Sequence, residues 1–303
     1  MFSTNQPSEE TNENHLMAAP IIPEQAANIR VIYESDAVLA IDKPPTIAHH
    51  NSEDEMGIVS CVRHLQQEKK IHYQGRLYSV HRLDRVTSGI LLFAKSSEIA
   101  NELSEAFRNK SVTKYYVALT NKKPKKKQGW VKGDMAQSRR KAWKLTNTSK
   151  NPAMTRFFTA GLGKCRLGGT DDWADLDGFD SEQEDGVDAK NLLPKTMILF
   201  RPHTGKTHQL RVAAKSLSMP ILGDETYSDA KEAKTIKRTF LHALALHVNV
   251  KGEDITICNF PSSWFESDAD SEDVDADEGN GMKEVLESLL VKHCDNAAIS
   301  QMI

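Results

Sequence analysis

Cysteine and long apolar runs are scarce in this chain. Its 303 residues include four cysteines, and no two of them form a Cys-x-x-Cys pair. This spacing disfavours a zinc site, and so few cysteines suit a reducing compartment. No apolar run approaches the ~20 residues of a membrane helix, and the N-terminus lacks the basic and apolar regions of a secretory leader. We therefore expect a cytoplasmic protein without a membrane segment.

Ligand motifs for metals and nucleotides are also missing. The sequence has no His-Glu-x-x-His pattern, and His242 and His247 stand five residues apart in a run typical of a strand. Gly205-Lys206-Thr207 resembles the end of a phosphate-binding loop, but Phe200 occupies the place of the first glycine. We predict no metal and no cofactor.

Charge is distributed unevenly along the chain. Residues 170–189 hold nine acids and residues 266–278 hold eight, with no lysine or arginine in either stretch. Without these 17 acids, 39 basic residues stand against 25 acidic ones, so the rest of the chain carries a net charge of +14. Acidic blocks of this density are usually solvated and disordered, whereas a basic body suits a polyanionic partner.

The most informative stretch is residues 81–95, which read His-Arg-Leu-Asp-Arg-Val-Thr-Ser-Gly-Ile-Leu-Leu-Phe-Ala-Lys. Asp84 lies between Arg82 and Arg85, just before an apolar run that indicates a buried strand. Two neighbouring arginines should keep the carboxylate ionised. Local chemistry leaves two interpretations open: Asp84 is catalytic, or it forms a structural cap or ion pair.

Two further motifs follow in the chain. Residues 114–118 read Lys-Tyr-Tyr-Val-Ala, and residues 204–212 read Thr-Gly-Lys-Thr-His-Gln-Leu-Arg-Val, followed by Pro-Ile-Leu-Gly-Asp at 220–224. Together with the Asp84 motif, in this order, they resemble the RluA family of RNA pseudouridine synthases. The resemblance covers about residues 29–260.

The resemblance implies a fold and an activity. We expect an α+β catalytic domain over residues 29–265, built on a mixed, largely antiparallel sheet flanked by helices. The implied reaction isomerises specific uridines to pseudouridine in structured RNA, either ribosomal or transfer RNA. Some relatives carry a small RNA-binding domain before this point. With about 28 residues ahead of it here, we expect that domain to be absent. We also expect the protein to be a monomer.

The resemblance also assigns roles to residues. Asp84 would be the essential carboxylate, Tyr116 the aromatic that stacks on the target base, and Arg211 the cation that holds Asp84. Plainer interpretations exist for two of them. Tyr116 could be a core residue of an apolar strand, or a one-residue misreading for Tyr115, and Arg211 could be an ordinary residue on a helix face. Arg82 would fill the gap left by the extruded uridine. Further predicted RNA contacts are Arg85, Lys206 and His208.

A strongly basic segment, residues 121–144, interleaves cations with Trp130 and Trp143. Lysines and arginines with aromatic side chains suit phosphate contact and base stacking. The alternative is a solvated lysine-rich loop. We predict an RNA-clamping loop, with contacts from Lys125, Lys126, Lys127, Arg139 and Arg140.

The remaining chain divides into tails, strands and helices. Residues 1–28 are expected to form a disordered polar tail, residues 170–189 an acidic insertion, and residues 266–303 an acidic linker with a short amphipathic helix over 282–293. Apolar spacing predicts further helices over 57–69, from a cap at Ser97, and over 207–216. Strands are predicted over 30–33, 38–41, 113–119, 154–159, 195–201, 240–250 and 255–258.

Two other classes of protein compete with the enzyme. A catalytically silent RNA-binding protein would have no reason to keep Asp84, Tyr116 and Arg211 together. A hydrolase that used Asp84 would need a second carboxylate, and neither motif offers an obvious one.

Overall fold

A computed structural model describes residues 20–138, 142–163, 193–265 and 280–302 of the chain. The acidic insertion at 170–189, most of the acidic linker, and the predicted RNA contacts Arg139 and Arg140 lie outside the described residues. Within the described part, no helix is long and apolar enough to cross a membrane.

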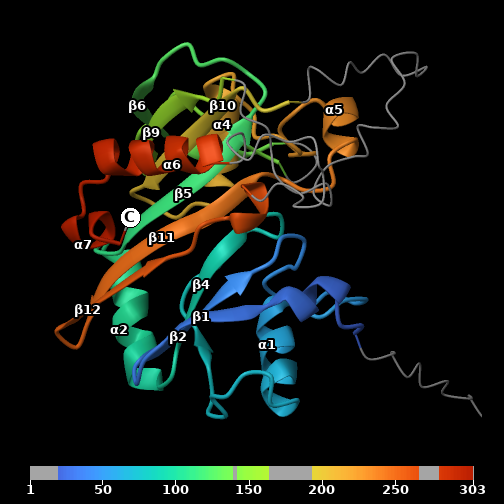
Figure 1. The fold of residues 1–303 in the computed structure, drawn as a ribbon, viewed down its shortest axis with the longest axis vertical. Helices are drawn as coiled ribbons and strands as arrows, with labels where there is room; N and C mark the ends of the chain where they lie inside the picture. The colour runs from blue at the N-terminus through green and yellow to red at the C-terminus, as the bar shows by residue number, and fades with distance from the viewer. Residues whose placement is uncertain (1–19, 139–141, 164–192, 266–279, 303) are drawn as a thin grey trace, which may run out of the picture.

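A long twisted sheet forms the centre of the molecule (Figure 1). Two short members lie off its main path: β12 (Glu253–Cys258) pairs with β11, and β3 (Tyr78–Ser79) pairs with β4. Within this sheet, all strand pairings described are antiparallel except the one between β4 and β11. Along the main path the order is β1 (Arg30–Glu34), β2 (Val38–Lys43), β4 (Ser88–Ala94), β11 (Leu241–Val250), β5 (Thr113–Thr120), β10 (Thr196–Pro202), β9 (Ala153–Gly161) and β6 (Gln128–Gly133).

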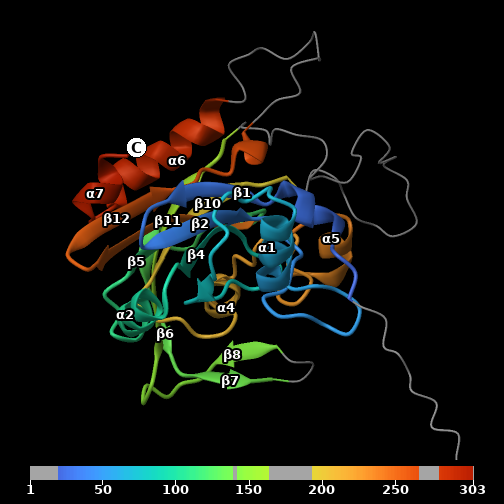
Figure 2. The same ribbon diagram turned by 90° about the horizontal axis from the view of Figure 1, so that it is seen from below.

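Helices cover both faces of the sheet (Figure 2). On one face lie α6 (Asn280–His293) and α7 (Ala297–Ser300); on the other lie α1 (Ile58–Gln67), α2 (Ser97–Arg108) and α4 (Gln209–Ser216). The short elements are η1 (Glu24–Asn28), α5 (Ala230–Lys234) and η5 (Ser262–Trp264). The expected α+β architecture is therefore confirmed.

Burial explains why these elements form where they do. Strand β4 is buried along its whole length, as its unbroken apolar run predicts. Helices α1 and α2 each bury one apolar stripe against the half of the sheet that contains β2 and β4. The start of α2 differs by one residue from the prediction: the Ser96 hydroxyl, not that of Ser97, accepts the Ile99 amide and caps the helix.

Part of the predicted N-terminal tail is folded. Residues 20–28 include η1, with Ala26 buried, and a bridge between Ile21 and Glu55. The expectation of a tail over 1–28 is therefore wrong for these residues. The backbone of Ile21 pairs with Asp54 and Met56, more than thirty residues along the chain, and such distant pairing leaves no local pattern in the sequence.

The basic segment is not a plain loop. Residues 128–133 form β6, and β7 (Met135–Gln137) pairs with β8 (Trp143–Leu145) in a separate hairpin that projects from the body (Figure 2). The predicted loop is therefore wrong for residues 128–133. The exposed residues of β6, Lys132 among them, alternate with less exposed ones that include the buried Val131, which is the pattern of a strand with one face in solvent.

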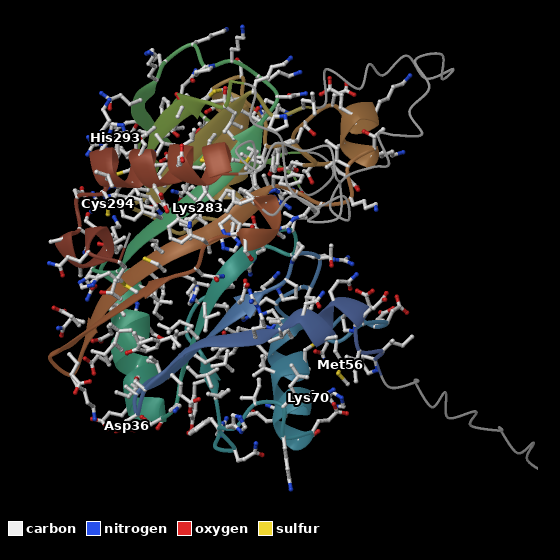
Figure 3. The ribbon with its side chains drawn as sticks, in the orientation of Figure 1. Asp36, Met56, Lys70, Lys283, His293 and Cys294 are labelled. Carbon is white, nitrogen blue, oxygen red and sulfur yellow. The ribbon has the colours of Figure 1, made fainter. Side chains whose placement is uncertain are left out.

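The C-terminal helix packs on the body. Four apolar side chains of α6 are buried beneath it, and the His293 ring stacks on Phe158 at 4.1 Å between centroids. His293 and Cys294 mark the end of this helix (Figure 3). Just beyond it, Asp295 accepts a hydrogen bond from the Tyr115 hydroxyl and pairs with Arg201. The four buried residues are Met282, Leu286, Leu289 and Leu290.

Removing a buried side chain from α6 should destabilise the protein. Leu286→Ala creates a cavity under the helix and is expected to lower the free energy of unfolding by about 2–5 kcal/mol, measured by urea denaturation. Val291 lies on the same helix with 71% of its surface exposed. Val291→Ala should therefore change stability by less than about 0.5 kcal/mol, and equal effects of the two would refute the docked arrangement.

Candidate active site

The loop that carries Asp84 joins the end of β3 to the start of β4. Its turn is closed by the Thr87 amide, which donates to the Asp84 carbonyl at 3.1 Å. His81 supports the loop from its other end: Nε2 accepts the Leu92 amide at 2.9 Å, and the ring stacks on Phe107. Burial lowers the pKa of His81 to about 3, so the ring is neutral and can accept this bond.

Lys43 holds the same loop by hydrogen bonds to its backbone carbonyls. This side chain, at the end of β2, is fully buried, and its Nζ donates to the carbonyls of Pro44, Arg85 and Thr87 at 2.8–3.2 Å. Burial lowers the pKa of Lys43 to about 7, while the nearby Asp84 charge opposes that shift. Three carbonyl acceptors give the ammonium group a complete set of partners. Sequence reasoning missed this role, although the Asp-Lys-Pro tripeptide at 42–44 was visible.

A close backbone approach fixes the far end of the loop. Gly89 has a φ of +102°, and a Cβ there would lie 2.4 Å from the Ala243 carbonyl oxygen. Only glycine permits this contact between the parallel strands β4 and β11. The adjacent Ser88 hydroxyl contacts His242 Nδ1 at 2.9 Å and accepts from Arg238 at 2.8 Å. The start of β4 is thereby attached to the later strand.

Arg211 faces Asp84 but is held by a different carboxylate. Its Nε and Nη2 donate to the two oxygens of Asp224, both at 2.8 Å, and Nη2 also donates to Thr226. Its third nitrogen, Nη1, lies 3.8 Å from Asp84 Oδ2. Arg211 was predicted to hold Asp84, but its two hydrogen-bonding nitrogens bind Asp224. Only Nη1 faces Asp84.

The Arg211–Asp224 pair is deeply buried, with side-chain exposures of 5% and 0%. Burial alone lowers the pKa of Arg211, but hydrogen bonding and attraction to Asp224 reverse this and raise it, so the guanidinium stays charged. Gly223, with a φ of +74°, turns the chain so that Asp224 points inward. The Pro-Ile-x-Gly-Asp motif contained this residue, but its pairing with Arg211 was not foreseen.

Tyr116 lines the same cavity as Asp84, whereas Tyr115 lies on the opposite face of β5 beneath α6. Successive side chains of a strand point to opposite faces, which accounts for this separation, and Tyr116 is the one of the two that lines the cavity. Burial, and then the negative charge of Asp84, raise the pKa of Tyr116 above its ordinary value. The phenol is therefore neutral at physiological pH.

The cavity around Asp84 is large and positively charged. Its volume is about 680 Å³, within the ~300–1,000 Å³ range of small-molecule sites. Among its described lining residues Asp84 is the single carboxylate, and no group of described side chains has the composition of a metal site. The basic lining residues are Arg82, Arg108, Lys110, Lys114 and Lys206.

The loop before α4 forms one wall of this cavity. Gln209 holds it: Oε1 accepts from the Thr204 hydroxyl and the Lys206 amide, and Nε2 donates to the Met154 carbonyl and to Thr155 on β9. Gln209 was quoted in the motif, but no role was predicted for it. Its four bonds place Lys206 at the cavity.

The other predicted RNA contacts are placed differently. Arg82 is exposed and lines the cavity. Arg85 instead donates to the Thr46 carbonyl and to Glu55 on the surface. His208 is the N-cap residue just before α4 and has a left-handed backbone conformation, and its Nδ1 contacts the Tyr227 hydroxyl at 2.9 Å.

The lysines at 125–127 lie far from the cavity. The Lys127 carbonyl accepts the Thr159 amide, and Thr159 stands five residues along β9 from Met154, which contacts His203. At ~3.4 Å per residue this separation is about 17 Å. A role for Lys125, Lys126 and Lys127 in RNA binding therefore stays a prediction, and it concerns a surface outside the cavity.

Comparison with known proteins now decides the family. Residues 37–216 match the family model described as RNA pseudouridylate synthase. The chain belongs to this family. The predicted resemblance to RluA-type RNA pseudouridine synthases is thereby confirmed, and the protein is a pseudouridine synthase, an isomerase that acts on RNA.

Curated relatives agree with this assignment. An uncharacterized RNA pseudouridine synthase of Haemophilus influenzae is 38% identical over 77% of this chain and 88% of the relative. Ribosomal large subunit pseudouridine synthase C of Rickettsia prowazekii is 32% identical over 75% of this chain, which spans 66% of that relative's length. The tRNA pseudouridine synthase C of Pasteurella multocida is 30% identical over 76% of this chain and 90% of the relative.

A solved structure shows the same fold. Human RNA Pseudouridylate Synthase Domain Containing 1 superposes with a TM-score of 0.59 over 80% of this chain and 88% of that chain, at 22% identity. The expected pseudouridine synthase fold is confirmed by this likeness together with the family match.

The three bonds of Lys43 make it a test of the loop's support. Lys43→Met leaves three carbonyl oxygens without their donor and should lower the free energy of unfolding by about 1–3 kcal/mol, with a loss of activity at temperatures where the variant is still folded. Lys251→Met is the control, because that side chain is half exposed and should shift stability by less than about 0.5 kcal/mol. Full activity in folded Lys43→Met would contradict the role.

The buried pair can be compared with an exposed one in the same chain. Asp224→Ala leaves the buried guanidinium of Arg211 charged and without the carboxylate that binds two of its nitrogens, and should cost about 3–5 kcal/mol of stability. Glu55→Ala removes the partner of Arg85, whose pair is about half exposed, and should cost less than about 1 kcal/mol. Urea denaturation of both variants measures the difference, and similar costs would show that the Arg211 fork is dispensable.

Proposed function

We propose that Asp84 is the catalytic carboxylate of this synthase and that its substrate is a loop uridine in structured ribosomal or transfer RNA. The observation that carries the proposal is its position: a lone carboxylate at a basic cavity, 3.8 Å from an arginine nitrogen whose other two nitrogens are fixed on Asp224. Such a carboxylate is oriented before the substrate arrives, which is what electrostatic catalysis requires.

The chemistry assigns one task to each group. Pseudouridine formation breaks the bond between C1′ and the uracil N1, turns the base, and joins C1′ to C5; C5 then loses its proton and N1 gains one, so the product is an isomer of uridine. Asp84 either attacks C1′ or assists formation of a glycal intermediate, and both routes need it ionised beside the sugar. Arg211 holds the negative charge in place, because its guanidinium cannot rotate without breaking two hydrogen bonds to Asp224.

Tyr116 and Arg82 act on the bases. The neutral phenol of Tyr116 offers a flat apolar face beside Asp84, suited to stacking on the detached uracil while it turns. Arg82 is exposed at the cavity, where it is free to enter the RNA stack. Extruding a base costs a few kcal/mol, and a side chain that takes its place offsets part of that cost.

The charge of the cavity and the names of the relatives both indicate a class of RNA. Five cations line the cavity, so it suits a polyanion with several phosphates near the target. Bases of a duplex are out of reach without unstacking, which favours a loop uridine. Relatives named for ribosomal and for transfer RNA both match this chain, and we propose one of these two classes, in the cytoplasm, as the substrate.

Pseudouridine mapping with a rescue experiment tests the proposal. Total RNA is mapped from cells without this gene and from the same cells carrying the wild type or Asp84→Asn. We expect at least one uridine to lose its modification in the knockout and to regain it with the wild type alone. Wild-type levels with Asp84→Asn would refute the catalytic assignment.

A binding measurement completes the comparison. Asp84→Asn should bind the identified RNA as tightly as the wild type, because the substitution removes a negative charge from a basic cavity and keeps its shape. If no uridine changes in the knockout while RNA binding persists, an RNA-binding protein without catalysis becomes the better description.

A further inference from the structure

Trp130 is an exposed aromatic side chain next to the cavity. It lies on β6, the edge strand of the sheet, with 43% of its surface exposed. Its ring centroid is 4.8 Å from that of His203, and His203 lines the cavity that contains Asp84. The tryptophan is therefore one ring removed from the cavity wall, at the edge of the sheet and on the face that carries α6.

Cations surround this pair of rings. The Lys132 Nζ lies 4.7 Å from the Trp130 ring centroid. Arg156 stands directly opposite Trp130 in the register of β6 and β9, so both project from the same face of the sheet. Arg201 stands opposite Arg156 on β10 and pairs with Asp295. Lys132 is exposed, and Arg156 is half-buried with its guanidinium over the Phe158 ring, so both place positive charge near the two rings.

His203 suits stacking rather than charge pairing. Its Nε2 is buried and lacks a hydrogen-bond partner among the described residues. Burial, and then the charge of Arg201, lower its pKa, while Asp295 acts in the opposite direction. A neutral imidazole whose plane is tilted 45° to the indole adds a second aromatic ring beside Trp130.

We propose that Trp130 and His203 form a stacking platform for an unpaired base adjacent to the target uridine, with Lys132 and Arg156 binding the accompanying phosphate. The proposal rests on the proposed function, since an extruded uridine in the cavity leaves its neighbour at the rim. Aromatic rings flanked by cations are the usual means of holding single-stranded RNA. The platform would make recognition depend on the neighbouring base.

Lys132 occupies the face of Trp130 that a base would take when RNA binds. The ammonium group lies over the tryptophan ring in the free protein, where a base would stack. An incoming base would displace it, and the exposed, flexible side chain could then reach the phosphate of the same nucleotide. One cation would thus cover the ring until RNA replaces it.

Binding to two matched RNA hairpins tests the platform. One hairpin carries a single loop uridine flanked by adenosines, and the other is identical except that both flanking nucleotides lack their bases. In an Asp84→Asn background, which prevents turnover, Trp130→Ala should weaken binding of the first hairpin by about 5–150-fold. Binding of the abasic hairpin should be unchanged, and Trp130→Phe should retain most of the affinity.

Val291→Ala, an exposed apolar substitution on α6, serves as the control and should change neither affinity. Equal losses by Trp130→Ala on both hairpins, or no loss on either, would overturn the platform. A loss of association with another protein, with RNA affinity intact, would also overturn it and identify Trp130 as a protein contact.

Kinetics separate this proposal from the assignment of Asp84. With the RNA identified by mapping, Trp130→Ala should raise KM and leave kcat at saturating RNA unchanged, because the platform binds but does not touch the reacting atoms. If Asp84→Asn abolishes modification while Trp130→Ala leaves KM unchanged, only the platform fails. If no pseudouridine forms but the difference between the two hairpins persists, the platform stands and the catalytic proposal fails.

Discussion

The buried pair between Arg211 and Asp224 is the interaction on which the site depends. Placing two charges where water cannot reach them is unfavourable unless their hydrogen bonds are complete. Here the two carboxylate oxygens take two guanidinium nitrogens, and the third nitrogen is left facing Asp84. The charge opposite Asp84 is therefore positioned by Asp224, which is fully buried and is not among the described residues that line the cavity. The position of the guanidinium nitrogen that faces Asp84 is thus set by a residue thirteen positions beyond the arginine.

Elements from distant parts of the chain complete this arrangement. Lys43 at the end of β2 ties down the carbonyls of the Asp84 loop, and Gly89 lets β4 meet β11 closely enough to fix where that loop ends. Tyr116 arrives from β5, between β11 and β10. Because each group sits on a strand or beside one, the rigidity of the sheet is passed to the site.

Much of this could be predicted from local pattern, and the remainder depended on geometry. Apolar runs and alternation predicted the strands, and the alternation of β5 separated Tyr116 from Tyr115. Sequence proximity was misleading for charge: Arg85 is next to Asp84 in the chain but turns outward to Glu55. The role of Lys43 and the pairing of Arg211 with Asp224 depend on how loops fold back, which no spacing encodes. Composition likewise hid β6 within a lysine-rich segment.

The parallel contact between β4 and β11 has a consequence for biosynthesis. Strand β11 lies between β4 and β5 in the sheet. In the sequence, however, about 120 residues separate the end of β5 from the start of β11. On the ribosome, β4 and β5 emerge long before the strand that joins them, so their facing edges stay unpaired meanwhile. Open edges of apolar strands attract other chains, and such long-range pairing is slow. A nascent chain halted before β11 would thus be a client for chaperones, and the Asp84 loop would reach its final shape late in synthesis.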